Sequence, residues 1–263
     1  MTEPRRSLVR IRRDLPVGLV LLFLFAPILV ILATHLGPSF SAAASGSPAR
    51  GVSALLADAA LMHGLGVSLL VGLVVTAVTV PLGLTGALAL DRLSVRTAAV
   101  LFAAMVAPIL VPGLAVGLAT SVFWHRFGIE SGLGLAILAQ SSRIAACTTT
   151  LFLLRLASLD RALEHAAVDL GASPALVMRH ILAPHLVPAV PLAAIGAFVL
   201  SFVDHDATIA AIGTERTFVT ELSARIVAGS SPAVDATGLV GALLVTAALV
   251  VVVIRAWVAR RPG

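Results

Sequence analysis

Three adjacent residues, Asp204, His205 and Asp206, are of the types that coordinate metal ions or attract cations. They follow the apolar run 185–203, so they stand at the expected outer end of a membrane-spanning helix. Neighbouring side chains on one helix point about 100° apart and cannot all face one ion, so we expect no metal site. We favour an acidic lining, made by Asp204 and Asp206, that receives a cationic substrate; a solvated helix end is the alternative.

Arg143 is a charged residue inside an apolar run, 131–156, where it follows Gln140, Ser141 and Ser142. A charge within a membrane span costs several kcal/mol on insertion scales. We therefore expect the side chain to face the interior of a helix bundle or to reach towards an interface. A role in a gate or subunit interface and a role in topology alone both remain open.

The sequence contains no motif of a catalytic centre: no His-Glu-x-x-His, no nucleophile elbow and no paired carboxylates within an apolar run. All eighteen basic residues are arginine, whereas the phosphate-binding Walker A loop requires a lysine. We therefore expect no catalytic residue and no cofactor in this chain. Any ATP and magnesium must be bound by a partner.

The elements that position these side chains are predicted to be membrane-spanning helices. Only 12% of the 263 residues are charged and 59% are hydrophobic, and the mean hydropathy is +1.07, whereas soluble domains carry roughly 25% charged residues. A helix needs about 20 apolar residues to cross the lipid core. We predict an all-α integral membrane protein of about six spans, at 15–35, 65–90, 97–124, 131–156, 185–203 and 236–257.

The first apolar run could instead belong to a cleaved secretory signal, because five arginines precede it and Ala42–Ala44 offers a small-residue cleavage site. The apolar core of such a signal is about 7–15 residues long. Leu15–Thr34 is an uninterrupted uncharged run of twenty. We therefore expect a retained anchor.

Arginines predict the orientation, because they are enriched on the cytoplasmic side of membrane proteins. With the N-terminus inside, the cytoplasmic segments hold thirteen arginines and the outer segments four. The net charge of +5 thus reflects arginines at the ends of spans, so we expect no nucleic-acid partner. The predicted order is a cytoplasmic tail 1–14, the span 15–35, an outer loop 36–64, a permeation core 65–258 and a cytoplasmic tail 259–263.

Between the fourth and fifth spans, the insert 157–184 is predicted to form two helices joined by a corner on the cytoplasmic side. An apolar stripe recurs at helical spacing on the first helix. Gly171 can adopt a left-handed conformation at its end, and Ser173 and Pro174 are favoured at the start of a second helix. Such a corner could be held by a partner protein, or it could be an amphipathic helix in the headgroup layer. The stripe consists of Leu163, Ala166, Ala167 and Leu170.

The insert resembles the cytoplasmic EAA loop in permease subunits of ATP-binding-cassette (ABC) importers. That signature runs Glu-Ala-Ala, three residues, Gly, then about nine residues to Ile-x-Leu-Pro. The run 169–173 is similar to the variant of the spermidine/putrescine branch and its iron, thiamine and phosphonate relatives, and the resemblance extends over 68–90, 197–213 and 231–245. The residues on the pattern are Ala166, Ala167, Gly171, Ile181 and Pro184.

Two positions depart from the signature: His165 takes the place of the glutamate, with Glu164 one residue early, and Ala183 precedes Pro184. One residue turns a helix by about 100°, so Glu164 cannot simply replace the missing glutamate. The resemblance implies that the loop is a coupling helix seated in a groove of a separate ATPase. The residues it assigns to coupling are Glu164, His165, Ala166, Ala167, Asp169, Leu170, Gly171, Ala172, Ser173 and Pro184.

The resemblance further implies a bacterial cytoplasmic-membrane protein with three kinds of partner: a second permease subunit, two ATPase subunits and an extracytoplasmic solute-binding protein. A polyamine-like cation is the favoured substrate; ferric iron, thiamine, phosphonate or another small anion are alternatives. The rival functions are a proton-coupled secondary transporter, which would need carboxylates near the midplane, and a membrane enzyme or assembly factor.

Overall fold

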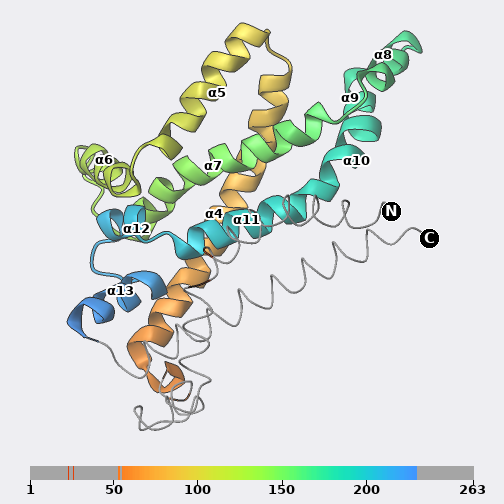
Figure 1. Ribbon diagram of the computed structural model, residues 1–263. Coiled ribbons are helices and arrows are strands. Elements are labelled where there is room, and N and C mark those ends of the chain that lie inside the picture. Colours follow the sequence, from red (N-terminus) through yellow and green to blue (C-terminus); the bar gives the residue numbers. More distant parts are fainter. Residues whose placement is uncertain (1–22, 24–25, 27–52, 54, 230–263) are drawn as a thin grey trace, which may run out of the picture. The chain divides into compact units, whose positions relative to one another are not determined.

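The computed structural model describes residues 23, 26, 53 and 55–229, and this part of the chain contains helices and no strand (Figure 1). The chain divides into two compact units, Ala60–Ala224 and the two terminal parts. The first and sixth predicted spans lie almost wholly outside the described residues, so the count of six spans stays a prediction. The helices are α4 (Ala59–Asp91), α5 (Val95–Leu110), α6 (Gly113–His125), α7 (Leu133–Ala157), α8 (Arg161–Asp169), α9 (Pro174–Val177), α10 (Ala183–Leu186), α11 (Val190–Val203), α12 (Asp206–Ala211) and α13 (Phe218–Ala228).

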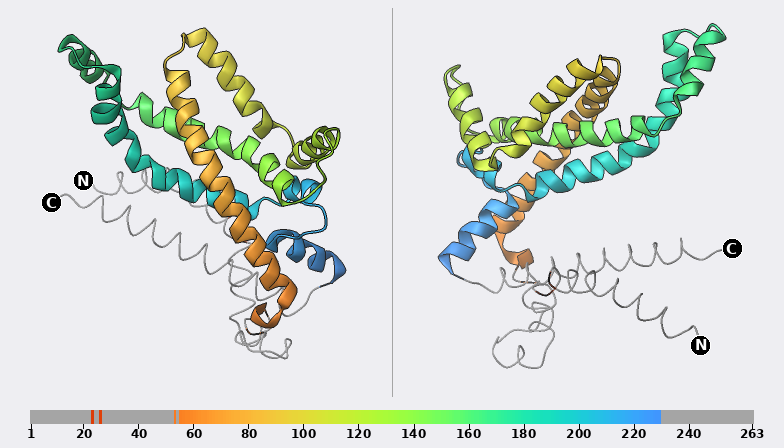
Figure 2. Two further views of the ribbon diagram at one scale, coloured as in Figure 1. Left: turned by 180° about the vertical axis from the view of Figure 1, so that it is seen from behind. Right: turned by 45° about the horizontal axis from the view of Figure 1, so that its top comes forward.

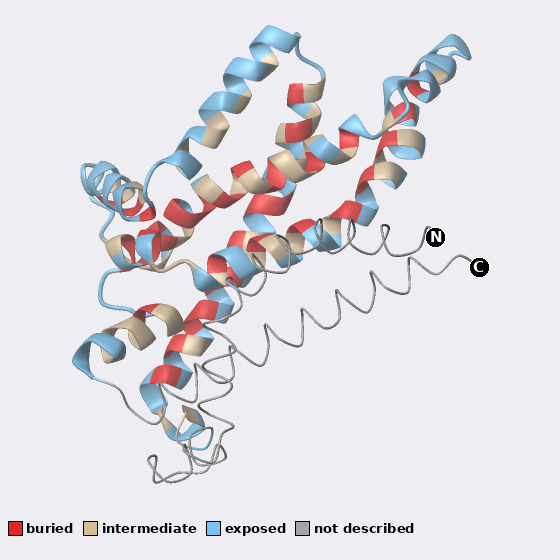
Figure 3. Cartoon of the chain, in the orientation of Figure 1, coloured by how far each residue is buried: buried red, intermediate tan, exposed pale blue. Residues whose placement is uncertain are grey.

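Three helical segments in the described residues are long and apolar enough to cross a membrane: α4, α7 and the run Pro174–Val203. The predicted spans 65–90 and 131–156 are therefore confirmed as single helices. Each of these two helices has a buried side and an exposed side. Small and apolar residues of α4 and α7 are buried in the bundle, while leucines such as Leu73 and Leu154 are exposed (Figure 3).

The third predicted span, 97–124, differs from the prediction because it is broken. Helices α5 and α6 meet at an angle of 104°. Val111 is extended, at φ −85° and ψ 136°, because the ring of Pro112 disfavours a helical conformation in the residue before it. Pro112 then precedes the first turn of α6. Pro108, one turn earlier, stays within α5.

The fifth predicted span begins earlier than expected. Prolines 184, 188 and 191 do not separate the insert from the membrane, since the helical run is continuous from Pro174 to Val203. A π-helical turn, Met178–Leu182, and a 3₁₀ turn, Val187–Ala189, lie within it. These changes of pitch let the run pass residues that cannot donate a backbone hydrogen bond.

The core of the unit Ala60–Ala224 lies where α4 crosses α7 and α11, which run side by side (Figures 1 and 2). Glycines allow both close approaches. A Cβ on Gly83 would lie 2.2 Å from Oγ1 of Thr148 on α7, and one on Gly72 would lie 2.9 Å from the ring of Phe198 on α11. Thr148 also donates to the Thr79 carbonyl at 2.8 Å. Small residues and an interhelical hydrogen bond thus replace the hydrophobic driving force that lipid does not supply.

Helix α6 packs on the short helix α12 through three small residues spaced one turn apart, Gly113, Gly117 and Ser121, all buried. A Cβ on Gly117 would lie 2.4 Å from the Ala207 carbonyl oxygen. Ser121 Oγ donates to the Ala210 carbonyl at 3.0 Å. The pair Gly113 and Gly117 therefore sets the separation of two helices, as small residues four apart commonly do in membranes.

We expect Gly117→Ala to lower the melting temperature of the purified protein in detergent, because the new methyl group must push backbone away from backbone. Gly66→Ala is the matched control: Gly66 is also helical, and a Cβ there meets nothing within 4 Å. That control should be neutral or stabilising by about 0.5–1 kcal/mol. Equal melting temperatures for the two variants would contradict the close α6–α12 contact.

Candidate functional site

The predicted corner in the insert 157–184 is present. Helix α8 is capped at its amino-terminal end by Asp160, whose side chain accepts from the Ala162 amide at 2.9 Å. At its other end the Gly171 amide donates to the Val168 carbonyl at 2.8 Å, and the Ala172 amide donates to the Ala167 carbonyl at 2.9 Å. This pair of bonds is the Schellman motif, which requires a left-handed residue at the position of Gly171. Its φ is +80°, as predicted.

The second helix of the corner begins as predicted. Ser173 is extended, and its hydroxyl accepts from the Leu176 amide at 3.4 Å. Pro174 occupies the first helical position, where its missing N–H costs nothing. Three residues, Leu170 to Ala172, therefore separate the last residue of α8 from the Ser173 cap, and the backbone of the corner is fixed by hydrogen bonds on both sides.

The apolar stripe predicted on α8 does not pack as a stripe. Only Ala167 lies against the hydrophobic core, joined there by Ala172 beyond the corner. Leu163 and Leu170 are exposed, Leu170 by 89%. Val168 is also exposed, so most of the apolar side chains on α8 are not covered by other described residues (Figure 3). The exposed members of the predicted coupling set are His165, Ala166, Asp169, Leu170, Gly171, Ser173 and Pro184.

Glu164 is the exception among the polar residues of α8, because it is buried. Its Oε1 accepts from Arg161 Nη1 at 2.8 Å. Its Oε2 lies 3.6 Å from Arg92 Nη2. Glu164 therefore faces the body of the protein, while His165, at the signature's glutamate position, faces outwards. The one-residue offset noted in the sequence thus places the acid and the histidine on different sides of the helix.

Two further residues that sequence reasoning missed tie α7 to α10. Arg155 Nε donates to the His185 carbonyl at 2.9 Å, and His185 Nε2 lies 2.7 Å from the Arg155 carbonyl. The His185 carbonyl is two residues before the 3₁₀ turn Val187–Ala189. Only the positions of these residues near span ends could have drawn attention to them.

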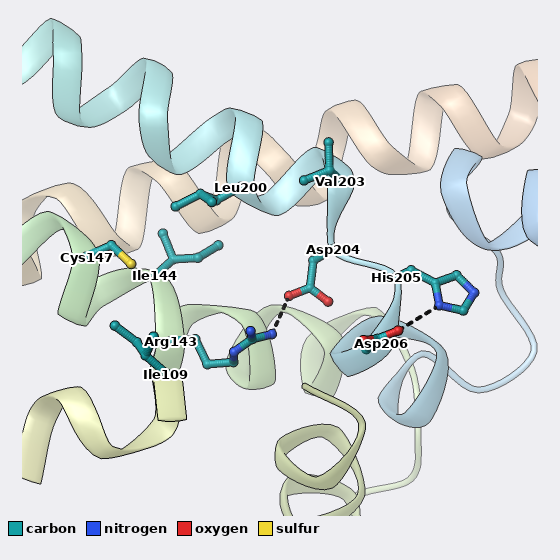
Figure 4. Close-up of a pocket in the computed structure, with 9 residues that line it drawn as sticks. All are labelled: Ile109, Arg143, Ile144, Cys147, Leu200, Val203, Asp204, His205 and Asp206. Carbon is teal, nitrogen blue, oxygen red and sulfur yellow. Dashed lines mark hydrogen bonds and ion pairs between the residues drawn. The ribbon is translucent and has the colours of Figure 1, made fainter. Parts of the chain in front are cut away.

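The second candidate site is a pocket of about 430 Å³ among α5, α7, α11 and the segment that follows α11. It brings together Arg143, Asp204 and Asp206, which the sequence had singled out separately (Figure 4). Arg143 Nη1 donates to Asp204 Oδ2 at 3.1 Å. The Asp204 side chain is only 9% exposed and that of Arg143 27%. The remaining lining is largely apolar: Ile109, Ile144, Cys147, Leu200 and Val203, with His205 at the rim.

The prediction that residues 204–206 share one helix is wrong. Helix α11 ends at Val203, Asp204 is extended, and α12 begins at Asp206. The break is stabilised by Asp204 itself, whose Oδ1 accepts from the Ala207 amide at 3.0 Å. A carboxylate that accepts amides at the first turn of a helix is favoured by the helix dipole. Asp204 thus serves both the ion pair and the start of α12.

Gln140, one turn before Arg143 on α7, holds the same segment from inside the bundle. Its Nε2 donates to Thr208 Oγ1 on α12 at 2.6 Å, and its Oε1 accepts from Ser201 Oγ on α11. Gln140 has no exposed surface. A buried amide specifies one packing arrangement when both its N–H donor and its oxygen acceptor are hydrogen-bonded. Here the Gln140 side chain joins α7, α11 and α12.

Asp206 does not point at Arg143. Its Oδ1 lies 3.1 Å from His205 Nδ1 (Figure 4). His205 Nε2 lies 2.7 Å from Ser223 Oγ on α13. The Asp206 side chain is 71% exposed. Within the described residues no three His, Cys, Asp or Glu side chains are grouped to hold a metal ion. The pocket therefore pairs one shielded carboxylate with an arginine and leaves a second carboxylate at its rim.

Comparison with known proteins gives related membrane permeases. The chain is 30% identical over 190 residues to the putrescine transport system permease protein PotI of Escherichia coli K12, covering 69% of this chain and 68% of PotI. It is 27% identical over 159 residues to a spermidine/putrescine transport system permease protein PotC homolog of Mycoplasma pneumoniae, covering 59% of this chain and 56% of the homolog. No family model matches the sequence.

Among solved structures, the fold is similar to a chain of a bacterial ABC transporter involved in the import of the acidic polysaccharide alginate. The TM-score is 0.63 over 97% of this chain and 99% of that chain, at 15% sequence identity. Likeness at this identity shows the fold alone. It confirms the predicted all-α fold.

We expect Arg143→Gln and Asp204→Asn each to destabilise the protein by about 1–3 kcal/mol, because each leaves a shielded partner without its counter-charge. The double variant should lose less than the sum of the two. Asp206→Asn is the control, expected to stay within about 0.5 kcal/mol because the side chain is exposed. Thermal unfolding of the four variants and the unaltered protein in one detergent measures all of these effects, and strictly additive losses would exclude a working ion pair.

Proposed function

Because the chain belongs to the family of ABC-importer permease subunits, we propose that it forms half of the translocation pathway for a small solute. A second permease subunit supplies the other half, and two ATPase subunits drive the cycle. An extracytoplasmic binding protein delivers the solute. The chain itself contributes no nucleotide site, in keeping with its lack of lysine.

The observation that carries the coupling role is the corner between α8 and α9. Its backbone is fixed by the Schellman bonds and the Ser173 cap, while its apolar side chains Val168 and Leu170 are exposed. A rigid turn that presents uncovered leucine and valine is suited to a groove of a partner protein. The arginine asymmetry supports a cytoplasmic location for this corner and for both termini.

A polyamine-like cation is the substrate class that the relatives' names favour, and the exposed carboxylate of Asp206 at the pocket supports it. Asp204 is already neutralised by Arg143, so an incoming amine would first meet Asp206 at the rim. Arg143 is the observation that supports a second class, small anions such as phosphonate, because its guanidinium lines the same pocket. Ferric iron and thiamine remain further candidates of the same branch.

The rival function of a proton-coupled carrier has less support. Such a carrier needs a carboxylate that gains and loses a proton during transport. Burial raises the pKa of the Asp204 carboxyl, while Arg143 and the Ala207 amide act in the opposite direction, so this carboxylate does not decide between the two functions; the permease relatives favour the importer. Retention of an ATPase by the purified complex would separate the importer from this rival and from an assembly factor.

We expect Gly171→Val to reach the membrane at normal levels but to retain its ATPase poorly. A side chain at a φ of +80° costs about 1–2 kcal/mol, and a β-branched one costs more. No atom lies within 4 Å of the added Cβ, so the cost acts on the turn and not on packing. Association should weaken by roughly tenfold if the corner must keep its shape to bind.

Gly171→Asn is the matched control, because asparagine tolerates the left-handed conformation. Both variants are expressed with the partner subunits, and the ATPase that remains bound after affinity purification is measured. Asp169→Asn should have a smaller effect than Gly171→Val, since it removes a charge without moving the backbone. If Gly171→Val keeps its ATPase as well as Gly171→Asn does, the corner is an interfacial helix and not a coupling element.

A further inference from the structure

The first turn of α8 is tied to the end of α4 by four charged side chains, here called the charged joint: Asp91, Arg92, Arg161 and Glu164. Arg161 lies at its centre. Its Nη1 is 3.0 Å from Asp91 Oδ2 and 2.8 Å from Glu164 Oε1. Its Nη2 also donates to Asp91 Oδ1, and Arg92 approaches Glu164 from the other side. Arg161 therefore bridges two elements that are 70 residues apart in the sequence.

The charged joint differs from an ordinary surface ion pair because its carboxylates are shielded. The side chains of Asp91 and Glu164 are each only 11% exposed. The planar guanidinium meets Asp91 with two donors, a geometry that restricts both distance and orientation. The hydrogen bond to Asp91 is the main cause of the raised pKa of Arg161. Without Arg161, two shielded carboxylates would face each other with only Arg92 for compensation.

The rest of α8 makes few contacts with the hydrophobic core. Its far end rests on the core through Ala167, and Ala172 follows beyond the corner. Leu163, Val168 and Leu170 are exposed. The amino-terminal end of α8 is therefore held by the charged joint, and Asp91 is the last residue of α4. The charged joint therefore links the amino-terminal end of α8 to α4, the helix that crosses both α7 and α11.

We propose that the charged joint is the element that passes movement of the α8–α9 corner to α4 during the transport cycle. The inference rests on the proposed function, since it assumes that an ATPase moves the corner. Asp91 and Arg161 act as positioning residues: they touch neither solute nor ATPase in this scheme. They differ from the docking surface, which lies on the opposite, exposed residues of α8.

The test measures the movement of α4 directly and needs no knowledge of the solute. The subunit is purified with its partner permease and ATPase subunits in a Cys147→Ser background. Spin labels are attached to cysteines at Ala77 on α4 and Leu154 on α7, both exposed. Distance distributions between the labels are compared without nucleotide and after trapping with ATP and vanadate, in lipid nanodiscs.

Nucleotide trapping should shift the α4–α7 distance in the otherwise unaltered complex, and Asp91→Asn should reduce that shift by at least half. Asp91→Glu, which keeps the charge, should retain most of it. Arg161→Gln should lose as much as Asp91→Asn, and the double variant no more than either, because all three remove the same link. Glu130→Gln is the control for loss of an exposed carboxylate elsewhere and should keep the full shift.

ATPase retention is measured on the same preparations and separates the two claims. If the unaltered subunit holds no ATPase, the proposed function fails. If the ATPase is held and Asp91→Asn shows the full shift, the charged joint transmits nothing and the inference is overturned. The inference is equally overturned if nucleotide trapping shifts no distance in the unaltered complex, or if Glu130→Gln loses as much as Asp91→Asn.

Discussion

Side-chain hydrogen bonds from α7 to three neighbouring parts of the bundle are the interactions on which its arrangement depends. Gln140 joins α11 and α12, Thr148 reaches α4, and Arg155 reaches α10. In lipid, no water is present to bond a polar group that loses its partner. Each of these hydrogen bonds therefore restricts how α7 can pack against its neighbours. Helix α7 thus connects the pocket and the corner as one stiff element.

The pocket and the corner lie at opposite ends of the same two helices. Arg143 and Arg155 are twelve residues apart on α7, which corresponds to about 18 Å along a helix. Helix α11 runs beside α7 and ends at the Asp204 break, while its other end continues through a π-helical turn to α9 (Figure 1). A tilt of the corner therefore has a continuous helical route to the pocket, with distorted turns where bending is easiest. The Arg143–Asp204 pair joins α7 to the carboxyl-terminal end of α11, where that helical run ends.

Local chemistry made some features predictable from sequence and left others hidden. The Gly171 turn, the Ser173 cap and the spans 65–90 and 131–156 followed from residue preferences and apolar length, which act over a few residues. The prolines near Val111 indicate a possible break, but the angle between α5 and α6 depends on the packing of α6 against α12. The pairing of Asp91 with Arg161 could not be predicted from residue spacing, because the two residues are 70 apart in the sequence and meet only through the packing of the helices. The burial of Glu164 likewise depends on which side of α8 meets α4.

Site-specific photo-crosslinking shows whether the α8–α9 corner lies against an ATPase subunit. A photoreactive amino acid replaces Leu170, 89% exposed at the corner, or Leu110, 80% exposed at the end of α5 near the pocket. The assembled complex is irradiated in membranes, and cross-linked partners are identified by mass spectrometry. We expect an ATPase adduct from position 170 and none from position 110. Lipid adducts alone from position 170, in a complex that retains its ATPase, would contradict that expectation.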